Sequence, residues 1–137
     1  MKYITWKRFR RNGINGAHFN LPWGTELEKK DDGILYHEGK PVAVARSFAS
    51  HEHFARNDDG EGIRRGELSS AIIKALGGNT RETTPEWEAV FDDPVCQNLR
   101  RKEHEDYWLW DDSFFQAPIE DLEHIAGLVG LKKGAAA

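Results

Sequence analysis

A chain of 137 residues is long enough to bury a core of its own, and it contains one cysteine, so an internal disulfide is excluded. The apolar fraction of 39% and the charged fraction of 31% fit a globular protein and exclude an intrinsically disordered one. The formal net charge of −4 is unevenly spread. Residues 1–11 carry five cations and no acid, whereas residues 82–124 carry thirteen acids against three cations.

A lone cysteine, Cys96, favours a reducing compartment, because secreted domains of this size usually carry cysteine pairs. No apolar run approaches the roughly 20 residues of a membrane helix, and no apolar segment follows the first positive charge. The sequence therefore predicts a cytoplasmic protein that makes no membrane contact. Cys96 itself is expected to be a small buried hydrophobe.

Alternation of apolar and polar residues predicts short strands over the first 46 residues, at 2–9, 25–28, 34–37 and 41–45. Tight turns are expected between the last three of these strands, where Asp, Gly and Lys gather. Three strands joined by such turns form an antiparallel β-meander, and the strand at 2–9 would close it into a small SH3-like barrel. An open antiparallel sheet covered by helices is the alternative.

After residue 47 the apolar period changes to that of helices. We predict helices near 61–76, 85–91, 94–100 and 118–129, with a further short one through His53 and Phe54. The chain is thus expected to be an α+β protein with three to five short helices in its C-terminal part. It is predicted to form a single domain, with a β part at 2–46, a helical part at 47–130 and a loose tail at 131–137.

One segment concentrates potential metal ligands, namely His51, His53, Asp58 and Asp59. Imidazole and carboxylate groups are common ligands of divalent metals, so a metal site or a metal-dependent enzyme is one hypothesis. The His-x-His spacing serves a shared ion only in an extended segment, because on a helix the two rings would point about 200° apart. The competing interpretation is a capped turn that leads into the helix at 61–76.

A second segment combines a phenylalanine, Phe9, with four cations, Lys7, Arg8, Arg10 and Arg11. The cations could contact phosphates and Phe9 could stack on a base, which makes nucleic-acid binding a further hypothesis. The pI of about 5.9 disfavours it, because nucleic-acid-binding domains are usually basic. A solvated strand end, or a surface that pairs with the acidic half of the protein, explains the same residues.

A third segment holds five aromatics in nine residues, Tyr107, Trp108, Trp110, Phe114 and Phe115. Exposed aromatics are typical of protein interfaces, so this cluster is the predicted contact surface for a protein partner or for self-association. The alternative is that the same side chains pack the helices onto the β part. Trp23, which lies between Pro22 and Gly24, is expected to plug the mouth of the barrel.

Several common catalytic motifs are absent from the sequence. It has no Gly-rich phosphate loop, no Gly-x-Ser-x-Gly elbow, no His-Glu-x-x-His and no Cys-x-x-Cys. No pair of carboxylates is singled out by its spacing either. We therefore expect no cofactor and no catalytic residues, and whether the protein is an enzyme stays open, with the balance against it.

Four stretches, 20–25, 53–60, 108–110 and 117–122, together resemble small uncharacterised proteins that are encoded in phages and prophages of Gram-positive bacteria. The resemblance covers most of the chain, but its motifs carry no known chemistry and bring no catalytic residues with them. It implies a phage product that works in the host cytoplasm. The leading hypothesis is a non-enzymatic accessory protein that acts through protein–protein contacts.

Overall fold

The computed structural model describes residues 1–45, 48–77, 80–82, 85–104 and 107–131. The chain is organised into two compact units, Met1–Gly66 and Glu67–Ala137, and each is described by itself. The boundary lies inside a helix and not at residue 46, where the predicted β part ends. That the whole chain acts as one domain stays a prediction. So does the loose tail, of which residues 132–137 lie outside the described part.

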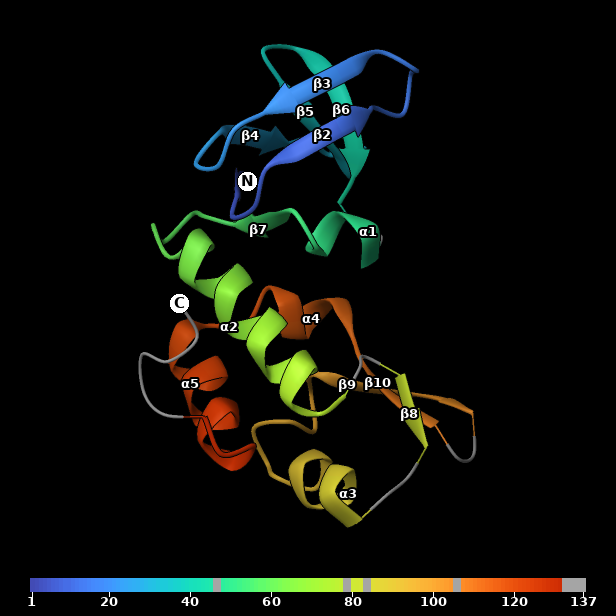
Figure 1. Ribbon diagram of the computed structural model, residues 1–137, viewed down its shortest axis with the longest axis vertical. Coiled ribbons are helices and arrows are strands. Elements are labelled where there is room, and N and C mark those ends of the chain that lie inside the picture. The colour runs from blue at the N-terminus through green and yellow to red at the C-terminus, as the bar shows by residue number, and fades with distance from the viewer. Residues whose placement is uncertain (46–47, 78–79, 83–84, 105–106, 132–137) are drawn as a thin grey trace. The chain divides into compact units, whose positions relative to one another are not determined.

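The first unit consists mainly of short strands (Figure 1). In chain order its elements are β1 (Lys2–Thr5), β2 (Phe9–Asn12), β3 (His18–Leu21), β4 (Glu26–Lys29), β5 (Ile34–His37), β6 (Lys40–Val44), α1 (Phe48–His51) and β7 (Phe54–Arg56). The predicted strands at 25–28, 34–37 and 41–45 correspond to β4, β5 and β6. The predicted strand at 2–9 is in fact two, β1 and the start of β2, because a bend at residues 6–8 interrupts it.

Five strands of this unit form an antiparallel sheet in the order β6-β5-β4-β1-β7. The predicted meander is present as β4, β5 and β6. The SH3-like barrel is not confirmed, because β1 pairs with β4 and β7 and leaves β6 and β7 at the edges of an open sheet. The chain is nevertheless a mixed α+β protein with an N-terminal antiparallel sheet and several C-terminal helices, as predicted.

Strands β2 and β3 form a separate antiparallel hairpin (Figure 1). Its buried side chains, Phe9, Phe19 and Leu21, belong to one core with buried side chains of the five-stranded sheet. Because side chains alternate along a strand, the hairpin turns its other face to solvent. The sheet contributes to this core Tyr3, Leu27, Leu35, Val42, Ala45 and Phe54.

The two predicted turns of the meander are present, and residues with positive φ make them possible. Gly33 has a φ of 78° and its N–H donates to the carbonyl of Lys30, which closes the turn between β4 and β5. Glu38 and Gly39 have φ values of 51° and 79° between β5 and β6. Two positive values in succession suit the tight hairpin turns that match the twist of the flanking strands.

The second unit contains helices together with a small sheet. Helix α2 (Gly62–Ala75) starts in the first unit and continues into the second. It is followed by β8 (Thr80–Glu82), α3 (Pro85–Phe91), β9 (Arg100–His104), β10 (Tyr107–Trp110), α4 (Asp112–Phe115) and α5 (Ile119–Leu128). The helices predicted at 61–76, 85–91 and 118–129 are thereby confirmed. The three-stranded sheet, in the order β8-β10-β9, was not predicted.

The helix predicted at 94–100 is wrong. The carboxylate of Asp93 accepts the N–H of Val95, and its carbonyl accepts the N–H of Cys96, so the chain turns instead of coiling regularly. Arg100 then enters β9, where it pairs with Trp110. The short helix predicted through His53 and Phe54 is also wrong, because α1 ends at His51 and Phe54 starts β7.

A second core fills the second unit. Its largest fully buried side chains include Trp110, Phe91 and Phe114, with Ile72 from α2 and Leu122 from α5. The ring of Trp110 stacks on that of Phe114 at 4.2 Å between centroids and lies 4.6 Å from that of Phe91. Within the described residues, no helix is long and apolar enough to cross a membrane.

Candidate functional site

Three of the four potential metal ligands, His53, Asp58 and Asp59, use their side chains in contacts within the fold, and His51 is held at its backbone. The carbonyl of His51 accepts a hydrogen bond from the Trp6 indole N–H at 3.0 Å. Oδ1 of Asp58 accepts the backbone N–H of Lys2 at 2.8 Å. Among the residues that the structure describes, no three His, Cys, Asp or Glu side chains are grouped so that they could hold an ion.

His53 is buried against the hairpin and is held by both ring nitrogens. Nδ1 lies 3.0 Å from the carbonyl of Arg8, and Nε2 lies 3.1 Å from a guanidinium nitrogen of Arg11. A carbonyl only accepts, so Nδ1 carries the hydrogen and Nε2 accepts from Arg11. Burial lowers the pKa of His53, and the positive charges of Arg11 and Lys7 lower it further. His53 is therefore a neutral structural residue that anchors the backbone of the basic segment.

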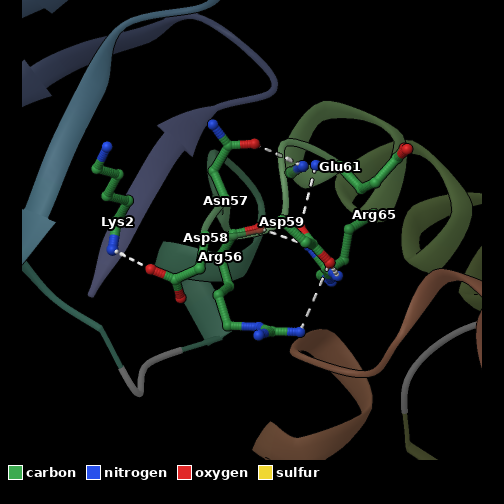
Figure 2. Close-up of polar contacts among 8 residues, drawn as sticks. Lys2, Arg56, Asn57, Asp58, Asp59, Glu61 and Arg65 are labelled. Atoms are coloured by element: carbon green, nitrogen blue, oxygen red, sulfur yellow. Dashed lines mark hydrogen bonds and ion pairs between the residues drawn. The ribbon is translucent and has the colours of Figure 1, made fainter.

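The loop between β7 and α2 uses its polar side chains to start the helix (Figure 2). Oδ1 of Asn57 accepts the N–H of Gly62 at 2.8 Å, and Oδ1 of Asp59 accepts the N–H of Glu61 at 3.0 Å. Both bonds satisfy backbone donors near the start of α2 that have no partner within the helix. The interpretation of this segment as a capped turn is therefore confirmed.

Arg65 completes this loop from the first turns of α2. Its side chain is fully buried and donates to Asp59 at 2.5 and 3.1 Å and to the carbonyl of Arg56 at 2.6 Å (Figure 2). The guanidinium of Arg65 lowers the pKa of Asp59 to about 2. Paired in this way, Asp59 fixes the loop and is not free to serve as a metal ligand.

The aromatic segment lies mostly in the core. Trp110 and Phe114 are completely buried and Phe115 nearly so, which contradicts their predicted place on an exposed contact surface. They pack the second unit, as the alternative interpretation holds. The side chains of Tyr107 and Trp108 lie outside the described part of the structure.

Two further features of the second unit, the Cys96 thiol and the pair of His124 and Asp93, are of types that occur in catalytic sites. Burial raises the pKa of the Cys96 thiol to about 12, so the thiolate needed for nucleophilic attack does not form near neutral pH. Nε2 of His124 lies 3.0 Å from Asp93, and this pair is partly exposed at the surface of the second unit. Hydrogen bonding to His124 lowers the pKa of Asp93.

Several exposed side chains lie at or near one end of the β2–β3 hairpin. We call Lys7, Arg8, Arg10 and Trp23 the hairpin surface. The three cations are exposed, and none of their side chains forms a hydrogen bond or ion pair within the described part of the chain. Arg11 differs from them, because it contacts His53 and lies 5.6 Å above the ring of Phe9. Phe9 is buried, so the prediction that it stacks on a base is wrong.

Trp23 is 60% exposed, so the prediction that it plugs a barrel mouth is wrong as well. The turn that carries it is nevertheless tightly held. The hydroxyls of Thr5 and Thr25 donate to the carbonyl of Pro22 at 2.7 and 2.6 Å, and the N–H of Gly24 donates to the carbonyl of Thr5 at 2.9 Å. With a φ of 85°, Gly24 adopts the left-handed conformation that the turn requires.

Comparisons with models of protein families, with curated proteins and with solved structures find no significant match for this chain.

Proposed function

We propose that the protein is a non-enzymatic, phage-type accessory protein that acts in the cytoplasm by binding a partner through its hairpin surface. One observation carries the proposal. A rigid turn exposes the large apolar ring of Trp23 at the end of the hairpin where Lys7 and Arg8 precede β2, and these two cations and Arg10 are exposed without an ion pair to any described residue.

The turn at Trp23 supports this role energetically. Tryptophan is among the residues that contribute most at binding interfaces, because its ring supplies a large contact area with few rotatable bonds. A turn held by the hydroxyls of Thr5 and Thr25 is already ordered before binding. Less conformational entropy is then lost when a partner binds.

Two of the pockets of the described residues offer little for acid–base catalysis, unlike a third of about 370 Å³ that Lys30, Tyr36 and Glu38 help to line. A pocket of about 260 Å³ between the hairpin and β6 has Arg11 as the one charged side chain in its lining. Another, of about 500 Å³, lies among the ends of α2, α3 and α5 and is lined by apolar residues and a glycine. Neither places a general acid beside a general base, which acid–base catalysis would require.

The sequence offered two kinds of partner, a protein and a nucleic acid. A protein partner was expected to bind the aromatic segment, but the described aromatic side chains of that segment are buried. Trp23 is exposed, and we propose it as the aromatic residue that contacts the partner. The basic segment expected to contact nucleic acid contributes Lys7, Arg8 and Arg10 to the same surface. Both hypotheses now concern one place on the molecule.

Site-specific cross-linking tests this placement without assuming a partner. A photoreactive phenylalanine analogue replaces Trp23 in producing cells, and the matched control carries it at Glu28. Glu28 alternates with the buried Leu27, so it lies on the outer face of the five-stranded sheet. We expect adducts from position 23 and none from position 28. Equal adducts from both positions, or none from position 23, would contradict the proposed function.

A further inference from the structure

We infer that the hairpin surface binds single-stranded nucleic acid, with an unpaired base stacked on Trp23 and phosphate groups next to Lys7, Arg8 and Arg10. The inference rests on the proposed function, because it names the class of partner for the same surface. The inference depends on the local excess of positive charge near Trp23, which the negative net charge of the whole protein does not reveal.

The first unit is basic although the protein as a whole is acidic. It carries twelve Lys or Arg against nine Asp or Glu, a formal charge of +3, whereas the second unit carries seven against fourteen, a charge of −7. The first acidic residue of the chain is Glu26, so β1, β2 and β3 contain cations and no acid. Salt screens exposed charges beyond about 8–10 Å, so a phosphate responds to this local excess more than to the overall pI.

The three cations are free to act on a ligand. By contrast, Arg65 in the same unit is a cation with internal partners. Its guanidinium is buried and bound to Asp59 and to the carbonyl of Arg56. Lys7, Arg8 and Arg10 have no such contact in the described part of the chain. Binding an anion then breaks no internal ion pair, while it releases counterions from the nucleic acid.

The pairing of β2 with β3 brings Trp23 and the cations to one end of the hairpin. Phe9 is paired with Leu21, so the chain leaves the hairpin at this end through Arg8 on one strand and through Pro22 on the other. Trp23 follows Pro22 directly. Cations and an aromatic ring at one place are the two elements with which proteins bind single strands, since phosphates meet the cations and bases stack on the ring.

The rest of the outer hairpin face is compatible with this ligand. Arg10 is paired with Asn20 and Asn12 with His18, and all four are exposed. They alternate with the buried Phe19 and Leu21, so they form the solvent-facing side of the hairpin. Arginine, asparagine and histidine side chains can donate to phosphates and to base edges, and neither strand of the hairpin carries a carboxylate.

A single strand fits better than a duplex. A base can stack on Trp23 only if its face is uncovered, and in a duplex the neighbouring base pairs cover it. The carboxylates of an acidic protein segment could pair with the cations, but such a segment has no base that could stack on the ring of Trp23. We therefore assign the surface to a single strand and treat an acidic protein as the competing outcome of the experiment.

Binding of a labelled oligothymidine to the purified full-length chain tests the inference. We expect an oligonucleotide of about 16 nucleotides to raise the fluorescence anisotropy on binding and to quench tryptophan emission. Three contacted phosphates on a single strand predict a slope of about −2 in log K against log salt concentration. A duplex of the same length is expected to bind more weakly.

Two variants separate stacking from charge. Trp23→Ala is expected to weaken binding roughly tenfold or more with an unchanged salt slope, while Trp23→Phe keeps most of the affinity. Arg10→Gln is expected to reduce the salt slope by roughly 0.7. Lys2→Gln is the matched control. Lys2 is an exposed cation of β1 and alternates with Tyr3, whose side chain faces the core shared with the hairpin, so Lys2 points to the opposite face of the five-stranded sheet. Its loss should leave binding unchanged.

Absence of binding at low salt would overturn the inference, and so would wild-type affinity in both Trp23→Ala and Arg10→Gln. Adducts at position 23 that nuclease leaves unchanged, and whose mass spectra contain peptides of a second protein, would assign the surface to a protein. The proposed function would then stand without this inference. Nuclease-sensitive adducts support both, and the absence of any adduct at position 23 contradicts the proposed function itself.

Discussion

The hairpin surface and the loop that precedes α2 lie in the same unit and are both rich in charge, yet they use it differently. At the loop, Asp58 accepts the N–H of Lys2 in β1, while Asp59 and Arg65 bind each other and the backbone near the start of α2 (Figure 2). At the hairpin surface, Arg8 and Arg10 have side chains with no partner in the described chain. Charges committed to the fold can thus be told from charges available for binding.

Aromatic side chains show the same contrast. Trp110 is completely buried and stacked on Phe114, whereas Trp23 is exposed on a turn that Thr5 and Thr25 hold without it. The contrast implies that side chains committed to the fold are costly to remove, and that residues of the hairpin surface are not.

Replacement of Trp110 by alanine should have the largest effect. We expect Trp110→Ala to lower the free energy of unfolding by about 4 kcal/mol, because it leaves a large cavity in the core of the second unit. Trp23→Ala should change it by less than about 0.5 kcal/mol, since an exposed ring leaves no cavity. Urea denaturation of the two variants measures both values. Similar losses in the two would remove the contrast.

Replacement of Arg65 should come next. Arg65→Ala removes the guanidinium hydrogen bonds to Asp59 and to the carbonyl of Arg56 and empties a buried site, so we expect a loss of about 3 kcal/mol. Arg10→Ala is the matched control and should cost less than about 0.5 kcal/mol. Thermal and urea unfolding of both proteins give the comparison. A loss at Arg10 as large as that at Arg65 would contradict the account.

Two helical glycines, Gly66 in α2 and Gly127 in α5, differ in how closely other residues pack against them. A Cβ on Gly66 would lie 2.0 Å from Cγ of Trp6, whose ring is fixed by its bond to the carbonyl of His51. We expect Gly66→Ala to cost about 2 kcal/mol through overpacking. Gly127→Ala meets nothing within 4 Å in α5 and should stabilise the protein by roughly 0.5–1 kcal/mol, through its better helix propensity. If calorimetry gives both changes the same sign, the packing argument fails.

Acid should release the contact between Asp59 and Arg65. The pKa of Asp59 is lowered to about 2 from 3.8, so its contribution is complete above pH 3.8 and is lost as the pH falls through 2. We expect Asp59→Asn to cost about 1 kcal/mol at neutral pH, a modest value because Asp59 is 39% exposed and water screens the pair. The difference between variant and wild type should shrink between pH 4 and pH 2 in urea titrations. A constant difference would contradict this assignment.

Much of the local structure could be predicted from the sequence, because turns and caps depend on near neighbours. Gly33 and Gly39 indicate turns through their conformational freedom, and the spacing of apolar residues indicates α5. Strands β7 and β8 have three residues each, too few for a period to be visible. They form because distant strands offer them hydrogen-bonding partners.

The candidate site was predictable only in part. The run of cations at Lys7, Arg8 and Arg10 is visible in the sequence, and its exposure is confirmed. The exposure of Trp23 and the burial of Trp110 are the reverse of what we expected, because burial depends on what the fold brings against a side chain. A cue was available at Trp23, since Pro22 and Gly24 on either side of it favour a turn at the surface.

We expect the hairpin surface to be dispensable for folding and required for binding. The most direct test is one protein that combines Arg8→Gln, Arg10→Gln and Trp23→Ala, with its urea stability and its affinity for oligothymidine measured on the same preparation. We expect a free energy of unfolding within about 1 kcal/mol of the wild type and no measurable binding at a salt concentration where the wild type binds. Wild-type affinity in this variant, or a loss of stability of about 3 kcal/mol, would contradict it.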